Sequence, residues 1–155
     1  MNSSSDVTIP FTKAGYQTIL DKLDVLNNNR PNILKRLQTA REMGDLSENG
    51  AYKAARFELS DTDRQVRRLT YLKIMGRVAV PRQHVQVEFG NQVTLTKSNG
   101  EITYTLVNQY EADPQKFKIS VDSPLGQALL GKKAGDQVDF TTPAGPSYFK
   151  IKAIG

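Results

Sequence analysis

The chain has 155 residues, with 21 basic and 16 acidic side chains and a formal net charge of +5. This length allows one ordinary domain or two small ones, and the charge is only a mild bias towards polyanions such as nucleic acid. The absence of cysteine excludes a disulfide framework and a thiolate metal site, and a cytoplasmic protein is expected. The stretch Met1–Asp6 lacks the basic and apolar regions of a signal peptide. No run approaches the ~20 apolar residues of a membrane span, so no membrane partner is expected.

Residues 12 to about 75 carry the period of a helix. Thr12 stands where an N-cap is expected, directly before the periodic run. Apolar residues then recur at alternating spacings of three and four, which places them on one narrow helix face. The two series are Tyr16, Leu23, Arg30 and Leu37, and Ile19, Leu26, Ile33 and Ala40. Arg30 interrupts the apolar pattern, and Pro31 is expected to bend the helix because it lacks an N–H.

A second helix is predicted from about Ser47 to Met75, after the short turn Gly44-Asp45-Leu46. Its apolar face is weaker and comprises Tyr52, Leu59 and Val66 with Ala55, Thr62 and Leu69. Two long helices joined by so short a turn must lie antiparallel. Because few apolar residues lie outside these faces, we expect a protruding coiled-coil hairpin about 45 Å long, at 1.5 Å per residue.

From about Arg77 the period changes to two, which predicts strands. The expected strands are Val85–Phe89, Val93–Thr96, Ile102–Val107, Lys118–Val121, Gln137–Phe140 and Tyr148–Ile151. Pro124–Leu130 is expected to form a short helix, because Pro124 suits the first helical position and Ser123 can cap it. The chain is therefore predicted to be α+β, with a helical hairpin over 1–76 and a small α+β domain over 77–155.

Two long motifs carry a resemblance to a known family. The first is Ala40–Asn49, AREMGDLSEN, with Arg30-Pro31 upstream; the second is Ile119–Lys132, ISVDSPLGQALLGK, followed by Gly135-Asp136. They resemble motifs of the bacterial Gre transcript-cleavage factors, GreA and GreB, and the match runs from Thr12 to Ile154. The resemblance implies an antiparallel coiled coil followed by a domain of FKBP-like fold. Features of both subtypes occur, so the subtype stays open.

The predicted turn carries two carboxylates, Asp45 and Glu48, three residues apart. Carboxylate oxygens suit Mg²⁺, which takes one or two of them and keeps several waters. Two carboxylates are too few for a private metal site, but they can complete a site that another protein begins. The resemblance implies that this protein is bacterial RNA polymerase. The coiled coil would enter the polymerase's secondary channel, where Asp45 and Glu48 would steady a polymerase Mg²⁺ near the 3′ end of backtracked RNA and stimulate its cleavage. The alternative is that Asp45 is a turn residue and Glu48 a favourable charge at a helix N-terminus.

Two further sets of residues are candidates for binding. A basic patch facing RNA could comprise Lys35, Arg36, Arg41, Arg64, Arg67 and Arg68, although a solvated helix surface explains them equally well. The resemblance implies that the loop Asp122, Ser123, Pro124 and Leu125 docks on the polymerase. A strand end followed by a helix cap would need the same residues.

One departure from the family pattern keeps other functions open. Family members usually carry a glutamate two residues after the tip asparagine, and this chain has Ala51 there. One alternative is therefore a Gre-like inhibitor that occupies the secondary channel without promoting cleavage. Another is a prolyl isomerase or chaperone, whose pocket would draw on Phe89, Tyr104, Tyr110, Phe117, Phe140, Tyr148 and Phe149. The protein is expected to be a monomer without a cofactor of its own, and not to be an enzyme by itself.

Overall fold

The computed structural model describes residues 7–155, so Met1–Asp6, where no signal peptide was expected, lies outside the described residues. The chain forms two compact units. One unit is Tyr16–Gly76, and the other combines Arg77–Gly155 with the segment that ends at Gly15. The described residues before Tyr16 thus group with the second unit and not with the hairpin. Within residues 7–155, no helix has both the length and the apolar character needed to cross a membrane.

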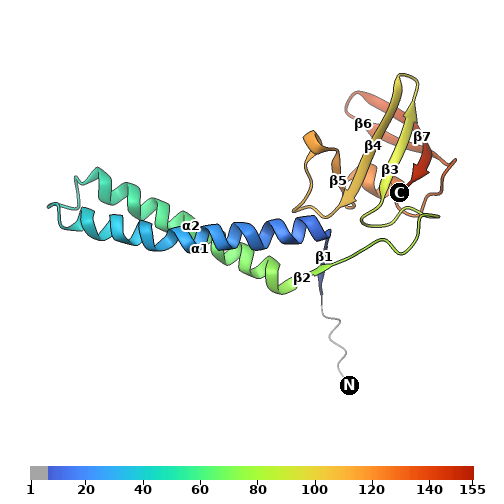
Figure 1. The fold of residues 1–155 in the computed structure, drawn as a ribbon. Helices are drawn as coiled ribbons and strands as arrows, with labels where there is room; N and C mark the ends of the chain where they lie inside the picture. The colour runs from blue at the N-terminus through green and yellow to red at the C-terminus, as the bar shows by residue number, and fades with distance from the viewer. Residues whose placement is uncertain (1–6) are drawn as a thin grey trace. The chain divides into compact units, whose positions relative to one another are not determined.

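The first unit is the predicted hairpin of two long helices, α1 (Lys13–Arg41) and α2 (Gly50–Met75), which run side by side (Figure 1). Their facing sides bury residues of the predicted apolar series, namely Ile19, Leu23, Ile33, Leu37, Ala40, Ala55 and Thr62, together with Leu72. The predicted start of α2 at Ser47 is wrong. The helix begins at Gly50 because Asn49 is its N-cap and accepts a hydrogen bond from the Tyr52 backbone N–H.

Arg30, which interrupts the apolar series, is accounted for by a partner on the other helix. Its Nε lies 2.7 Å from Asp63 Oδ1 and its Nη2 lies 3.2 Å from Asp63 Oδ2. Both side chains are half-buried. The two-pronged geometry matches a guanidinium to a carboxylate, and this hydrogen bonding lowers the pKa of Asp63. With the Arg36–Glu58 pair nearer the turn, it fixes the antiparallel register of the hairpin.

The second unit contains a five-stranded sheet and confirms the prediction of an α+β chain. Its strands are β3 (Gln92–Lys97), β4 (Gly100–Val107), β5 (Lys118–Ser120), β6 (Gln137–Thr142) and β7 (Gly145–Ile154), in the order β5-β4-β3-β7-β6. All neighbours are antiparallel except the pair β4 and β5. The helix α3 (Pro124–Leu129) contributes Leu129 to the core beside Val87, Val93, Leu95, Leu106, Val138 and Ile151. The short helix η1 (Pro114–Lys116) precedes β5.

A separate two-stranded sheet, which the sequence did not predict, joins β1 (Ile9–Phe11) to β2 (Gly76–Val78). Phe11 is fully buried, and its carbonyl accepts from the Ala79 N–H at 2.8 Å. The Asn108 side-chain amide donates to the Pro10 carbonyl at 2.5 Å. These bonds tie the N-terminal segment to residues far along the chain.

The start of α1 is held by Glu111. Thr12 caps the helix as predicted, because its Oγ1 accepts from the Gly15 N–H at 3.0 Å. The Thr12 N–H and hydroxyl both donate to Glu111 Oε1, at 2.8 and 3.1 Å. A Cβ at Gly15 would lie 1.7 Å from the same carboxylate oxygen. Glycine at this position therefore lets the carboxylate approach the first helical turn.

The strand predicted over Val85–Phe89 is wrong, because only Gln86 forms a bridge there, to Lys133. One reason is that a side chain takes a backbone donor of this segment: Asn91 Oδ1 accepts from the Glu88 N–H at 2.7 Å. Backbone groups satisfied in this way are not available for a continuous ladder. Val87 is nevertheless buried in the core.

Gly126 should not tolerate a side chain, although it lies in a helix. A Cβ added there would lie 2.1 Å from the Ser120 carbonyl oxygen and 2.9 Å from Val121 Cα, and both are backbone atoms. Gly126→Ala is expected to lower the free energy of unfolding by about 1–3 kcal/mol through overpacking. Thermal and urea unfolding would measure this loss.

The matched control is Gly50→Ala, at the start of α2. An added Cβ there meets nothing within 4 Å, so the higher helix propensity of alanine should stabilise the chain by up to ~1 kcal/mol. Equal effects of the two substitutions would contradict the proposed tight contact at Gly126.

Candidate functional site

The loop between the two helices forms the end of the hairpin (Figure 1). It covers residues 42–49, which is longer than the predicted turn Gly44–Leu46. Asn49 fixes it at both sides: its Nδ2 donates to the Ala40 carbonyl at 2.6 Å, and its Oδ1 accepts from the Tyr52 N–H at 3.0 Å. Gly44 has φ +120°, a conformation that favours glycine. The loop is therefore held at its base by one side chain that bridges the two helices.

Asp45 lies in this loop and is exposed. Its Oδ1 accepts from both the N–H and the hydroxyl of Ser47, each at 2.9 Å. These bonds, the backbone one first, lower the pKa of Asp45, so its carboxylate is ionised at neutral pH. The turn role considered from the sequence is thus real, but it uses only Oδ1.

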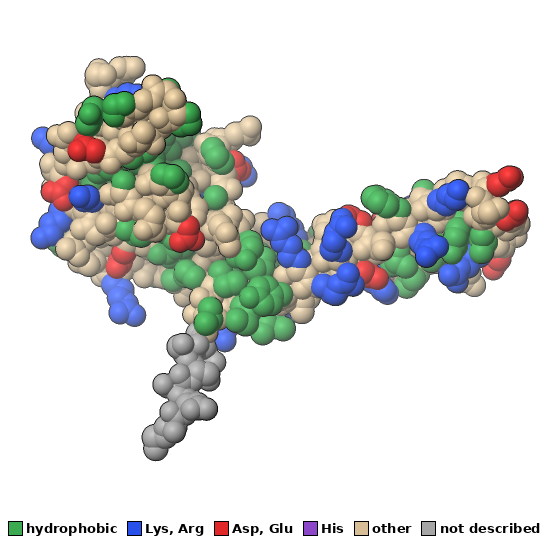
Figure 2. All heavy atoms as spheres, turned by 180° about the vertical axis from the view of Figure 1, so that it is seen from behind, with side chains coloured by type: hydrophobic (Ala, Val, Ile, Leu, Met, Phe, Trp, Pro, Cys, Tyr) green, Lys and Arg blue, Asp and Glu red, His purple; other side chains and the backbone are tan. Residues whose placement is uncertain are grey.

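Glu48 is exposed too, and it precedes the cap of α2. The first turn of α2 contains no acidic residue, because the helix begins at Gly50. Glu48 lies one residue before the cap Asn49, so its interpretation as a favourable charge at the N-terminus of α2 stays a prediction. Figure 2 shows acidic side chains at the end of the hairpin and basic side chains along it. The end of the hairpin thus carries two solvent-exposed carboxylates that a binding partner can reach.

The loop does not hold a metal site of its own. Among residues 7–155, no group of three or more His, Cys, Asp or Glu side chains is arranged to hold an ion. An exposed pair of carboxylates can instead provide part of the ligand set of an Mg²⁺ that retains waters or other ligands. The residues present therefore fit a shared ion and do not fit a private one.

The six basic candidates fall into two groups along the hairpin. Lys35, Arg36 and Arg41 are on the part of α1 nearer the loop, and Arg36 pairs with Glu58 at 2.8 Å. Arg64, Arg67 and Arg68 are on α2 beyond the Arg30–Asp63 pair. With that register, Arg41 and Arg67 are separated by about 20 Å along the axis, at 1.5 Å per residue. Arg64 is paired with Asp61, and the Arg41 guanidinium lies 5.8 Å from the Tyr52 ring centroid.

An apolar groove of about 410 Å³ lies beside the loop. Its lining combines Lys35, Arg36 and Thr39 with Ala40, Met43, Ala51, Ala54 and Ala55. No motif in the sequence predicts this groove. The sequence feature that could have indicated it is the run of small residues at the start of α2, which leaves space between the side chains of the two helices. Ala51, where the family pattern has a glutamate, is part of the lining.

The candidate docking loop joins β5 to α3. Asp122 and Pro124 are exposed, whereas Leu125 packs partly against the core. Ser123 is the N-cap: its Oγ accepts from the Gly126 N–H at 3.1 Å and donates to the Ser120 carbonyl at 2.6 Å. The side chains of Asp122 and Pro124 are therefore the better targets for a binding test, because changing them does not remove the cap.

Comparisons with known proteins connect both units to one family. Residues 9–75 match the family model described as "Transcription elongation factor, N-terminal", and residues 82–155 match "Transcription elongation factor, GreA/GreB, C-term". Two relatives named transcription elongation factor GreA, from Nautilia profundicola and Paracoccus denitrificans, are each 37% identical and cover 94% of this chain, with 93% and 96% of their own lengths matched. A solved structure of GreA factor homolog 1 from Thermus thermophilus is 26% identical, covering 96% of this chain and 99% of that one, with a TM-score of 0.45.

Proposed function

This chain belongs to the GreA/GreB family of transcription elongation factors, and we propose that it stimulates RNA polymerase to cleave backtracked RNA. In this proposal the hairpin enters the secondary channel of the bacterial polymerase and carries Asp45 and Glu48 to the 3′ end of the RNA. The chain acts as a monomer in the cytoplasm. It rescues arrested complexes through the polymerase's own endonucleolytic activity, so it is not an enzyme by itself.

The observation that carries the proposal is the exposed carboxylate pair on the loop. Phosphodiester hydrolysis is well served by a second Mg²⁺, which stabilises charge on the attacking and leaving oxygens. Asp45 and Glu48 would contribute ligands to that ion, and the polymerase would contribute the rest. Asp45 is ionised, and its side chain is held by Ser47. Its carboxylate would therefore need little conformational change to bind the Mg²⁺.

The two alternatives raised by the sequence have less support. An inhibitor would not need ionised carboxylates at the loop, and the curated relatives are named transcription elongation factors. A prolyl isomerase would need several free aromatic side chains around one pocket. Phe140 and Phe149 instead stack on each other, and Tyr104 packs edge-on against Phe117. An isomerase assay on the full chain would test this alternative separately.

Transcript cleavage on stalled complexes tests the proposal directly. Elongation complexes of the cognate polymerase, halted in a backtracked register with 3′-labelled RNA, should release short labelled fragments faster when the protein is added. The protein alone should leave the free RNA intact. Slower elongation without any released fragment would support the inhibitor and contradict the proposal.

The family difference at residue 51 gives a further prediction. Ala51 is exposed in the first turn of α2, so Ala51→Glu adds a carboxylate there without burying it. A negative charge at a helix N-terminus contributes about 0.3–1 kcal/mol of stability. It should also keep the helix start ordered and raise stimulated cleavage. Ala51→Gln has a similar shape without the charge, so equal gains from both variants would show that the charge is irrelevant.

A further inference from the structure

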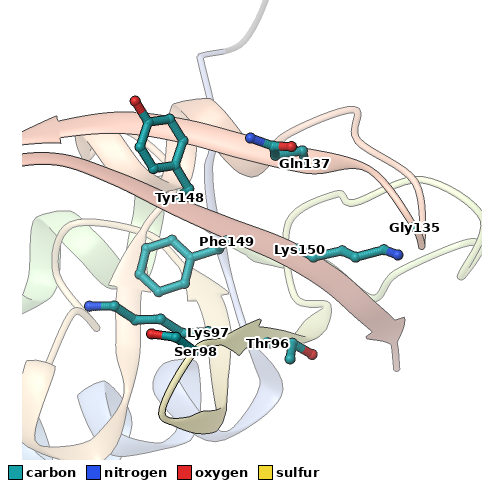
Figure 3. Close-up of a pocket in the computed structure, with 8 residues that line it drawn as sticks. All are labelled: Thr96, Lys97, Ser98, Gly135, Gln137, Tyr148, Phe149 and Lys150. Atoms are coloured by element: carbon teal, nitrogen blue, oxygen red, sulfur yellow. The ribbon is translucent and has the colours of Figure 1, made fainter.

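A groove of about 600 Å³ lies on the second unit, and none of the loop carboxylates, basic-patch residues or docking-loop residues lines it. Three separate segments line it. The end of β3 and the following turn provide Lys97 and Ser98, β7 provides Tyr148, Phe149 and Lys150, and the start of β6 provides Gln137. Figure 3 shows the Phe149 ring between the Tyr148 ring and the Lys97 side chain, with Lys150 farther along the strand.

The groove has a positive lining. Lys97 and Lys150 both line it, and none of its lining residues is acidic. Glu101 nearby is paired with Lys152. Among residues 7–155, neither Lys97 nor Lys150 forms an ion pair, which favours an anionic ligand.

The two aromatic rings have different roles. Phe149 stacks on Phe140 with centroids 5.5 Å apart, and the Lys97 ammonium lies 5.6 Å from its centroid. Phe149 thus belongs to the wall of the groove and positions Lys97. Tyr148 is different, because it remains 57% exposed. This large exposed ring lies on the same face of β7 as Lys150, two residues along the strand, and offers a stacking surface for a planar group.

We propose that this groove binds single-stranded RNA, with Tyr148 stacking against a base and Lys97 and Lys150 contacting phosphates. Aromatic platforms beside cationic side chains bind single strands without sequence preference, since every base has a flat face. The Ser98 hydroxyl and the Gln137 amide add hydrogen-bonding groups for the sugar and backbone. An acidic peptide would use the lysines but gain nothing from the exposed ring, so RNA is favoured. This inference does not depend on the loop carboxylates or on cleavage.

Fluorescence anisotropy with a labelled oligouridylate tests the proposal on the full-length protein without polymerase. Tyr148→Ala is expected to weaken binding about five-fold or more, from the loss of one stacking contact, whereas Tyr148→Phe should retain it. Lys150→Gln should weaken binding and reduce the slope of log affinity against log salt by about 0.7, the value for one phosphate contact with a single strand. The matched control is Lys152→Gln, two residues away on the same strand and paired with Glu101.

The hairpin also carries basic side chains, so each groove substitution is repeated with Arg64, Arg67 and Arg68 changed to Gln. The losses should persist in that background. Equal losses from Lys150→Gln and Lys152→Gln would show diffuse electrostatic attraction and overturn the site. Tighter binding of labelled polyglutamate than of oligouridylate, insensitive to Tyr148→Ala, would identify an acidic peptide and overturn the RNA assignment. Circular dichroism and thermal unfolding confirm that each variant is folded.

Discussion

Replacing Asp45 with Asn and Glu48 with Gln together is expected to reduce stimulated cleavage at least about 100-fold, the scale of losing a group aimed at developing charge. Both changes keep the shape of the side chain and remove its negative charge. The amide oxygen that Asp45→Asn introduces can still accept from Ser47, because the turn uses only Oδ1. Binding to the polymerase should remain, since the proposed docking loop is elsewhere in the chain. Cleavage rates and polymerase affinity, measured on the same samples, would show whether cleavage is lost while binding is retained.

The control is Glu42→Gln, which removes one exposed negative charge from the same end of the hairpin and should change cleavage little. The defect of the double variant should also shrink as Mg²⁺ is raised, because mass action refills a weakened site. A pure turn role makes a different prediction, since asparagine replaces aspartate well in turns. Full cleavage activity in the double variant would refute the mechanism.

A combined Asp122→Asn and Pro124→Ala variant is expected to weaken polymerase binding about ten-fold or more, if these residues form a centre of the interface. Both side chains are exposed, so the variant should remain folded. Ser123→Ala is a poorer choice, because the Ser123 hydroxyl caps α3 and bonds the Ser120 carbonyl. Its loss would cost roughly 0.5–2 kcal/mol of stability. Titration of labelled protein with core polymerase measures the affinity.

Pro143→Ala serves as the matched control for docking. Pro143 is an exposed proline between β6 and β7, and its replacement should leave polymerase affinity unchanged. At saturating concentrations the docking variant should recover most of its cleavage activity, because its loop carboxylates are intact. Unchanged affinity in the docking variant would remove Asp122 and Pro124 from the interface.

The parts of the fold that the sequence predicts are those determined by local periodicity. The three-and-four spacing from Tyr16 to Ala40 identified the buried face of α1, and Ser123-Pro124 located the start of α3. Arg30 interrupts the apolar series of α1, and the spacing of residues along the sequence could not explain why. Its partner Asp63 lies 33 residues away and becomes its neighbour only when the hairpin closes.

Features that depend on distant residues were missed. Ile9–Phe11 is too short to show a period, and it is a strand only because Gly76–Val78 pairs with it. Val85–Phe89 has the alternation of a strand, yet the Asn91 side chain takes the backbone N–H of Glu88 within it. The groove of Lys97, Gln137 and Tyr148 combines three segments that no motif connects. The roles of Asp45 and Glu48 at the loop were predicted from the resemblance of Ala40–Asn49 to a family motif, since their spacing alone suits a turn followed by a helix N-terminus.

The bonds from Thr12 to Glu111 constrain the order in which the protein is built on the ribosome. The hairpin Tyr16–Gly76 consists of local contacts and can close as soon as it emerges. The first turn of α1 must wait for an acceptor 99 residues downstream. At about 5–20 residues per second, Glu111 follows Gly76 by roughly 2–7 s. During that interval the Thr12 N–H lacks its acceptor, and the Pro10 carbonyl lacks Asn108 as its donor. We therefore expect Ile9–Phe11 to be most exposed to proteases, and to pairing with the wrong strand, in a nascent chain that is arrested in this interval.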